Sequence, residues 1–405
     1  MSQKIFMSGI GGIGMSALAQ LFVAEGNEVS GSDREESPTT RMLVEKGIAV
    51  AIGQIAQNIP EGTQLLVYSD AIPADNAERM TATEHDIPQQ SYFEALGKFA
   101  ETKRTVAIAG THGKTTTTAM LGKMLVDAGV DPTVVVGSIV TEWGSNFRAG
   151  KSDWLVVEAC EYRNHFLNFK PEVLVITNIE LDHTDFFKSI DEIRAAFDEA
   201  RSNAKVTIAS EQYRAESVPQ LLIPGEFNVE NARAAKAAAK CIAPEVPEEV
   251  WDKSLANYRG TWRRFEHKGT LPSGATLYDD YAHHPTAISR TLTAARELFP
   301  DKKIVLFFHP HLYSRTRDLF DEFSTALAQA DEAYILPVYA AREPHDPSVS
   351  HEALAAAVNK KGGHAKAVTG FEETTALLKM LGADKVAFTM GAGDVYKAGE
   401  AALKN

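Results

Sequence analysis

The chain contains only two cysteines, Cys160 and Cys241, among its 405 residues. Two cysteines are too few for a disulfide framework or a four-cysteine zinc site, so we expect both to be buried small apolar residues. No run approaches the roughly 18 apolar residues of a membrane span, and the first residues start a strand rather than a signal peptide. We therefore expect a soluble, cytoplasmic protein without a membrane partner.

Positive charge is scarce. The chain has 41 Lys and Arg against 54 Asp and Glu, a formal net charge of −13. This balance argues against nonspecific nucleic-acid binding, and a phosphate-bearing ligand would need a metal ion and a few local cations. The sequence does not indicate an oligomeric state.

Strand-like and helix-like segments alternate along the chain, which predicts an α/β fold with parallel sheets. Its length suggests about three domains, and we place them at residues 1–100, 101–262 and 263–405. Short apolar runs predict strands at 4–8, 27–31, 65–68, 105–109, 154–157, 173–176, 275–278, 304–308, 333–336 and 386–389. Helices are predicted at 14–25, 38–47, 228–241, 285–298, 316–329, 351–360 and 371–381.

Residues 110–118 read Gly-Thr-His-Gly-Lys-Thr-Thr-Thr-Thr and follow the apolar strand 105–109. A strand, a glycine turn and a helix start form the usual cradle for a triphosphate, held by backbone N–H groups and the helix dipole. Lys114 can reach the terminal phosphates, and Thr115 can place its hydroxyl on Mg²⁺. Ile108 stands where the standard motif has its first glycine, so the loop is shorter. The motif predicts ATP binding.

A second glycine loop, Gly-Ile-Gly-Gly-Ile-Gly at residues 9–14, follows the first strand. Its spacing fits Gly-x-Gly-x-x-Gly, and Ser32-Asp33 lies about twenty residues further on, where a Rossmann unit places its ribose-binding acid. A tight structural turn or a dinucleotide oxidoreductase would share this pattern. Together with an ATP loop, however, it suggests a nucleotide-linked substrate that is activated by phosphorylation.

Ligand sites of open α/β sheets form beyond the carboxyl ends of the strands. Glu158 ends one predicted strand, and His183 follows the next one. With Thr115 they could form an oxygen-rich Mg²⁺ shell, although imidazole is an uncommon Mg²⁺ ligand and His183 could equally be a hydrogen-bonded loop residue. Glu161, Glu180 and Asp182 could be supporting groups or solvated charges.

Five motifs occur in the order found in the Mur ligases, which the chain resembles from residue 4 to residue 394. They are the two glycine loops, Thr-Asn-Ile-Glu-Leu-Asp-His at 177–183, Asp-Asp-Tyr-Ala-His-His-Pro-Thr at 279–286 and Ser-Arg-Thr-Arg-Asp at 314–318. The resemblance implies a Rossmann-like UDP-binding domain, a central P-loop ATPase domain, and a Rossmann-like C-terminal domain that binds the amino acid and closes on ATP. The histidine in Gly-Thr-His-Gly-Lys favours the branch that adds L-alanine to UDP-N-acetylmuramate.

The resemblance also implies roles for individual residues. Lys114, Glu158, His183 and Arg264 would be catalytic, with Arg264 approaching the terminal phosphate and Thr115, Glu158 and His183 binding Mg²⁺. ATP would contact Gly110, Thr111, His112, Gly113, Lys114, Thr115, Thr116, Asn228, Asn231 and Asp280. The UDP-sugar would contact Gly9, Gly11, Gly12, Gly14, Ser32, Asp33, Ser69, His283 and Arg315.

Some alternatives and departures remain. Asp280, His283 and His284 could simply form a helix start before Pro285, and Arg263 could be a surface charge. Phe227 replaces a family histidine and could stack on adenine, Leu312 stands where some members have arginine, and the central domain is short.

The implied reaction transfers the γ-phosphoryl group of ATP to the lactyl carboxylate, and the amine of L-alanine then displaces phosphate. The amine base stays open between His183 and a nearby carboxylate. A sibling ligase that attaches a recovered murein peptide, an NAD-dependent oxidoreductase and a non-catalytic nucleotide-binding protein are the alternatives.

Overall fold

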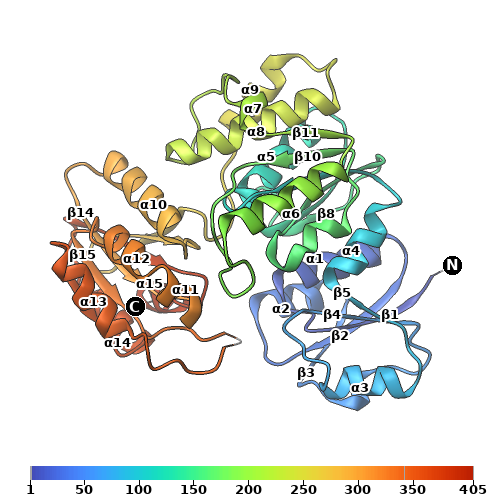
Figure 1. Ribbon diagram of the computed structural model, residues 1–405, viewed down its shortest axis with the longest axis horizontal. Helices are drawn as coiled ribbons and strands as arrows, with labels where there is room; N and C mark the ends of the chain where they lie inside the picture. Colours follow the sequence, from blue (N-terminus) through green and yellow to red (C-terminus); the bar gives the residue numbers. More distant parts are fainter. Residues whose placement is uncertain (1, 342, 405) are drawn as a thin grey trace. The chain divides into compact units, whose positions relative to one another are not determined.

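The computed structural model describes residues 2–341 and 343–404 and contains three sheets with mostly parallel strands (Figure 1). The chain divides into two compact units. The first runs up to Ile179 and also holds Arg194–Pro219 and Asn231–Ala256. The second holds Glu180–Ile193, Gln220–Glu230 and the chain from Asn257 onwards. The predicted α/β class is confirmed.

The first sheet has five parallel strands in the order β3-β2-β1-β4-β5. Because β1 lies in the middle, the loops after β1 and β4 meet at one edge, where an open α/β sheet binds ligands. The strands are β1 (Lys4–Ser8), β2 (Glu28–Asp33), β3 (Ala49–Ile52), β4 (Leu65–Tyr68) and β5 (Gln89–Ser91). The helices are α1 (Ile13–Ala24), α2 (Pro38–Glu45), α3 (Ala77–Glu84) and α4 (Tyr92–Ala100), with a 3₁₀ turn η1 (Ala56–Asn58).

The second sheet has the order β11-β10-β6-β9-β7-β8, and only β8 is antiparallel to its neighbour. Its strands are β6 (Arg104–Ala109), β7 (Thr133–Val140), β8 (Ser145–Arg148), β9 (Trp154–Glu158), β10 (Val173–Ile176) and β11 (Val206–Ile208). Its helices are α5 (Lys114–Asp127), α6 (Ile190–Ser202), α7 (Ser210–Tyr213), α8 (Glu226–Ile242) and α9 (Glu248–Ala256), with the 3₁₀ segment η2 (Tyr162–Asn168).

Helix α1 of the first sheet packs against β7 and β8 of the second sheet, inside the first unit. A buried polar network holds this contact: the Gln20 amide donates to Asn146 at 3.1 Å, and the Asn146 amide donates to the Ser16 hydroxyl at 3.0 Å. Buried polar groups with satisfied hydrogen bonds specify one arrangement of the surfaces that carry them. The two sheets of this unit are therefore joined by a specific interface.

The third sheet, in the second unit, has the order β12-β13-β17-β14-β15-β16 with an antiparallel edge strand β12. Strand β14 is buried on both faces, because Leu306 and Phe308 join one apolar cluster while Val305 and Phe307 join the other. The strands are β12 (Glu266–Thr270), β13 (Thr276–Asp280), β14 (Lys303–Phe308), β15 (Glu332–Ile335), β16 (Ala365–Ala367) and β17 (Lys385–Met390). The helices are α10 (Pro285–Leu298), α11 (Tyr313–Asp318), α12 (Phe320–Leu327), α13 (His351–Lys360), α14 (Phe371–Lys379) and α15 (Tyr396–Leu403).

Besides small differences in the bounds of helices and strands, two sequence predictions differ from the structure. The helix predicted at 316–329 is two helices, α11 and α12, because Leu319 leaves helical geometry with φ −114° and ψ 28°. The expectation of two buried cysteines is also wrong: Cys241 is exposed near the end of α8, and Cys160 is half-buried. No helix within the described ranges combines the length and the apolar character that a membrane crossing requires.

Candidate active site

The phosphate loop joins β6 to α5 and is held by residues that follow β10. Gly113, the N-cap of α5, adopts a left-handed conformation with φ 85°, which favours glycine. The Asn178 side chain accepts a hydrogen bond from the His112 amide at 2.9 Å, and the Asn178 carbonyl accepts one from the Thr111 amide at 3.0 Å. The Thr177 hydroxyl donates to the His112 carbonyl at 2.6 Å. Thr111, Thr115 and Thr116 are buried. The loop is therefore held both by these buried side chains and by its hydrogen bonds to Thr177 and Asn178.

Lys114 forms a buried ion pair with Glu161, whose carboxylate lies 2.8 Å from its ammonium. The same ammonium donates to the carbonyls of Gly110 and Thr111. Burial would lower the pKa of Lys114, but the charge and hydrogen bond of Glu161, together with smaller contributions from Cys160 and Glu158, outweigh it and the pKa is raised. Lys114 is therefore a permanent cation folded over the phosphate loop, and Glu161, which the sequence left undecided, is its buried partner.

Glu158, at the carboxyl end of β9, faces the first turn of α5. One carboxylate oxygen accepts a hydrogen bond from the Thr115 hydroxyl at 3.1 Å, and the other accepts one from the Gly137 amide of β7. A Cβ atom at Gly137 would lie 2.6 Å from the Glu158 carboxylate, so the carboxylate would have to move if residue 137 carried a side chain. The carboxylate and hydroxyl oxygens of Glu158 and Thr115 thus lie together, and such hard oxygen donors fit Mg²⁺.

The N-terminal glycine loop is tied to the ends of β2 and β4. The amide of Gly9, where φ is 78°, donates to the Ser32 carbonyl at 2.9 Å, and the Gly11 amide donates to the Asp33 carboxylate at 2.8 Å. A Cβ atom at Gly9 would lie 3.1 Å from the Ser69 side chain. Residues 9, 11, 32, 33 and 69 of the predicted UDP-sugar set are therefore neighbours.

The Ser32 side chain itself turns away from this loop toward a buried carboxylate. Its hydroxyl donates to Glu78 at 2.8 Å, and the Ser8 hydroxyl and the Asn58 amide donate to the same carboxylate at 2.5 and 2.9 Å. Glu78 is fully buried, so these three bonds compensate the loss of its hydration. Glu78 was not anticipated from the sequence.

In the second unit, the segment after β10 packs against the start of α11. The buried carboxylate of Asp182 accepts hydrogen bonds from the buried guanidinium of Arg315 at 2.9 Å. Burial would raise the pKa of Asp182, but Arg315 and neighbouring histidines hold it well below its usual value. The Asp182 side chain also accepts the amide of His183, which has a positive φ of 53°. Arg315 and His183, both predicted for the site, are therefore linked through Asp182.

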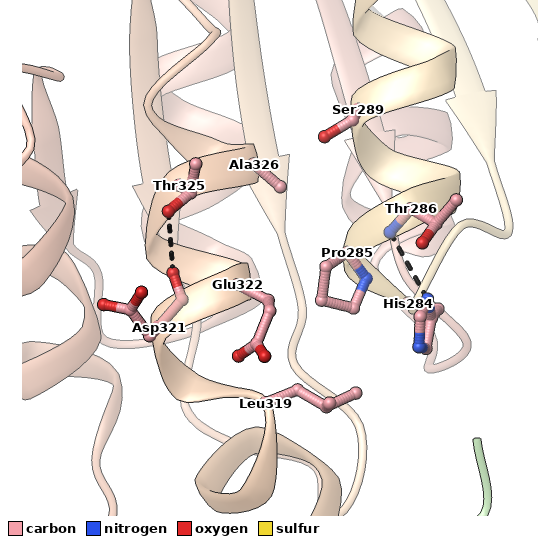
Figure 2. A pocket seen from close by; sticks show the side chains of 9 residues that line it. All are labelled: His284, Pro285, Thr286, Ser289, Leu319, Asp321, Glu322, Thr325 and Ala326. Atoms are coloured by element: carbon pink, nitrogen blue, oxygen red, sulfur yellow. Dashed lines mark hydrogen bonds between the residues drawn. The ribbon is translucent and has the colours of Figure 1, made fainter. Parts of the chain in front are cut away.

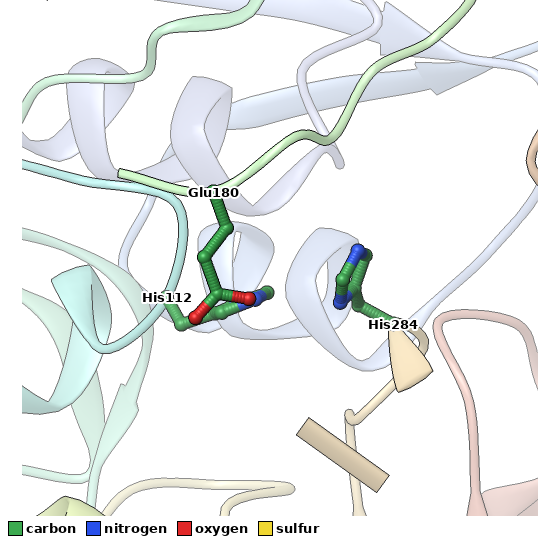
Figure 3. A group of neighbouring side chains, drawn as sticks. All are labelled: His112, Glu180 and His284. Carbon is green, nitrogen blue, oxygen red and sulfur yellow. The ribbon is translucent and has the colours of Figure 1, made fainter. Parts of the chain in front are cut away.

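The start of α10 lies beside the same segment. His284 caps this helix by accepting the Thr286 amide at 3.3 Å, and Pro285 is the first helical residue, so this end of the motif does form a helix start, whereas Asp280 belongs to β13. The Thr286 hydroxyl donates to Glu180 at 2.8 Å; the side chains of Glu180 and His284 are drawn in Figure 3.

Burial, with the charge of Arg315, holds the pKa of His283 well below its usual value, so its imidazole is neutral.

Arg263 is buried rather than a surface charge. Its guanidinium binds Asp279 at 2.7 Å and the carbonyls of Gly391 and Gly393 at 2.7 and 2.9 Å. The next residue, Arg264, lies over the Tyr281 ring, 5.0 Å from its centroid. Arg263 therefore fixes the backbone from which Arg264 projects.

Asp280, the last residue of β13, accepts the amides of Phe265 and Ala282, each at 2.7 Å. Burial raises its pKa to about 6, although the Arg264 guanidinium opposes the shift. Asp280 therefore titrates close to neutral pH.

Three family models match in sequence order. The Mur ligase family catalytic domain matches residues 4–104, the Mur ligase middle domain matches 108–206, and the Mur ligase glutamate ligase domain matches 263–393. The chain belongs to the Mur ligase family.

Named relatives align with nearly the full length of this Mur ligase. UDP-N-acetylmuramate–L-alanine ligases of Desulfitobacterium hafniense and Agathobacter rectalis are each 38% identical to it; both alignments cover 99% of this chain and 99% and 97% of the relatives. The alignment with the first extends over 449 positions against 405 residues here, so the relative carries insertions that this chain lacks.

Solved structures show the same architecture. The UDP-N-acetylmuramate–alanine ligase MurC of Thermotoga maritima is 27% identical, with a TM-score of 0.83 and coverage of 98% of this chain and 97% of that one. The murein peptide ligase of Psychrobacter arcticus has the same fold, with 20% identity, a TM-score of 0.71 and coverage of 100% and 99%.

Asn228 and Asn231, which the family resemblance assigned to ATP, and Phe227 lie at the start of α8. Asn231 is buried, and a Cβ atom on Gly113 would lie 2.2 Å from its side-chain oxygen, so Asn231 lies against the phosphate loop. The Asn228 amide donates to the Pro224 carbonyl at 2.6 Å, one turn earlier. Phe227 packs against the apolar core of the third sheet. Its stacking on adenine stays a prediction.

A pocket of about 330 Å³ opens between the starts of α10 and α12 (Figure 2). Its lining combines His284 and Thr286 with the acidic side chains Asp321 and Glu322. None of the residues predicted to bind ATP, metal or UDP-sugar lines it, but it shares His284 and Thr286 with the start of α10 described above.

Proposed function

We propose that this Mur ligase joins L-alanine to the lactyl carboxylate of UDP-N-acetylmuramate at the expense of ATP, in peptidoglycan precursor synthesis. The observation that carries the proposal is the cluster of Lys114, Thr115 and Glu158 at the phosphate loop. It occurs in a chain whose full-length relatives carry the name of that ligase. ATP use follows from the family and from the loop, and we place the reaction in the cytoplasm, where ATP is available.

In the first step, a carboxylate oxygen of the substrate attacks the γ-phosphorus of ATP. An O–P bond forms, the bond to the β,γ-bridging oxygen breaks, and ADP leaves. Lys114 and the start of α5 bind the phosphate oxygens and neutralise their charge, which is the main requirement of phosphoryl transfer. Thr115 and Glu158 would hold Mg²⁺, which would supply further charge neutralisation. His183 is assigned as a metal ligand by the family motif.

In the second step, the neutral amine of L-alanine attacks the carbonyl carbon of the acyl phosphate. The C–N bond forms, the C–O bond to phosphate breaks, and the amine loses a proton. No covalent bond to the protein is needed. In the second unit, Arg315, His283, Asp280 and Arg264 are our proposed contacts for the substrates.

We further propose that the UDP part of the substrate binds the N-terminal glycine loop. The positive end of α1 suits a diphosphate, and Asp33, at the end of β2 as in nucleotide-binding units, fixes the loop by accepting the Gly11 amide. Gly12 caps α1 without a side-chain hydrogen bond, so its first amides remain suited to an anion.

A phosphate-release assay tests the proposal directly. UDP-N-acetylmuramate, ATP and Mg²⁺ are incubated with L-alanine, L-serine, glycine or a murein tripeptide in separate reactions. Fastest release with L-alanine, and a product heavier by one alanine residue in mass spectrometry, is the expected result. Preference for the tripeptide would identify the sibling peptide ligase instead, and no release with any acceptor would refute ligase activity.

A further inference from the structure

The first residue of α4 places a phenol beside the N-terminal glycine loop. Ser91 caps this helix by accepting the Glu94 amide at 3.3 Å, and the Glu94 side chain accepts the Ser91 amide at 2.7 Å, so the position of Tyr92 is fixed by a capping box. The next residue, Phe93, contacts the Tyr92 ring edge-on at 4.7 Å and stacks on His165 at 4.2 Å. These contacts hold the start of α4 against η2 of the second sheet.

The third glycine of the loop leaves space for this phenol. A Cβ atom at Gly14 would lie 2.9 Å from the ring carbon that carries the Tyr92 hydroxyl and 3.1 Å from the hydroxyl oxygen. Gly14 lies in the first turn of α1, where the N–H groups of a helix start bind anions. The Tyr92 hydroxyl is therefore adjacent to the place proposed for the diphosphate.

The charge of Glu158 in the phosphate-loop cluster also acts on Tyr92. Burial, followed by the negative charge of Glu158, raises the pKa of Tyr92 above its ordinary value. The hydroxyl therefore keeps its proton at neutral pH and can act as a donor. Tyr92 is half-buried, and its hydroxyl makes no hydrogen bond to any residue in the described part of the chain. A protonated donor without an acceptor in the described part of the chain thus lies beside Gly14, within electrostatic range of Glu158.

We propose that Tyr92 is a further substrate-binding residue, whose hydroxyl donates a hydrogen bond to a diphosphate oxygen of UDP-N-acetylmuramate. The inference rests on the proposed function, because it takes the glycine loop as the UDP site. A hydrogen bond from a neutral hydroxyl to an anionic oxygen is among the stronger ones. Its loss is expected to weaken binding on the order of tenfold.

The test is Tyr92→Phe, which removes only the hydroxyl and keeps the ring against Gly14 and Phe93. Binding of UDP, UDP-N-acetylmuramate and ATP is measured by calorimetry, and KM and kcat by phosphate release. We expect affinity for both uridine ligands to fall about tenfold, with KM for UDP-N-acetylmuramate rising to match. ATP affinity, kcat and the melting temperature stay near wild type.

Tyr334→Phe is the matched control, since Tyr334 is half-buried in the third sheet and bonds Glu332 at 3.1 Å. Wild-type affinity of Tyr92→Phe for both uridine ligands would overturn the inference about Tyr92 alone. Failure of the wild-type protein to bind UDP-N-acetylmuramate would instead refute the proposed function. The two failures are therefore distinguishable.

Discussion

The ion pair between Lys114 and Glu161 makes the phosphate-loop lysine important for stability as well as for its proposed role in catalysis. The side chains are 16% and 2% exposed and lie 2.8 Å apart. Replacing Lys114 by Met would leave the Glu161 carboxylate buried without its cation, and breaking such a pair costs about 3–5 kcal/mol. For a folding unit of this size, that loss lowers Tm on the order of 10 °C.

The double variant Lys114→Met, Glu161→Gln separates the two roles. Because it removes both charges, it should recover most of the stability lost in Lys114→Met. It should not recover ligation, because phosphoryl transfer still lacks its cation. Lys123→Met serves as a control on the same helix, since Lys123 pairs with Asp127 rather than with the loop.

Thermal unfolding and phosphate release are measured on all variants, and UDP-N-acetylmuramate binding is measured by calorimetry. We expect both Lys114 variants to retain uridine nucleotide binding. A Lys114→Met protein as stable as wild type would contradict the proposed burial of the pair. Restored turnover in the double variant would show that Lys114 is not the phosphate-binding cation.

Three further changes have definite expected outcomes. Glu158→Gln should raise the Mg²⁺ concentration for half-maximal phosphate release at least about tenfold, since it removes a charged oxygen ligand; an unchanged titration would argue against the ligand role. Gly137→Ala should shift the Mg²⁺ titration in the same direction, because its Cβ would lie 2.6 Å from the Glu158 carboxylate; wild-type behaviour would show that the carboxylate can move freely. Burial lowers the pKa of His309 to about 4, so the neutral ring stabilises the fold above pH 6.5, and that stability is lost as the pH falls through 4. This His309 contribution is about 3 kcal/mol, and urea unfolding of His309→Gln should show a smaller loss between pH 7 and 4; equal losses would contradict the assignment.

Much of the fold could be predicted from the sequence because local patterns determine it. The strand at 65–68 and the helices at 285–298 and 351–360 have the predicted bounds, since apolar periodicity and start signals such as Pro285 mark them directly. Short or polar strands such as β5 (Gln89–Ser91) carry no such pattern. The predicted helix at 316–329 failed at Leu319, which no proline or glycine marks.

The positions of the phosphate loop and the glycine loop were also predicted correctly, because the glycine spacing of each motif marks the turn between a strand and a helix. The partners of these loops were not predictable. Glu161, Gly137 and Glu78 act on residues that are distant in sequence, and nothing in their own neighbourhoods distinguishes them from surface or structural residues. Arg263 shows the same limitation, since adjacent arginines in a polar stretch do not reveal which one is buried.

The close approach of Tyr92 to Gly14 couples two positions that would otherwise evolve independently. The Cβ atom of an alanine at position 14 would lie 2.9 Å from the Tyr92 ring, so either the ring must shift or the residue at position 92 must be smaller, and these two positions should covary among homologous ligases. A homologue without an aromatic residue at position 92 can carry a larger residue than glycine at position 14, whereas a homologue that keeps the ring is expected to keep the glycine. The residue at position 14 of a homologue should therefore indicate whether an aromatic ring lies against the start of its first helix.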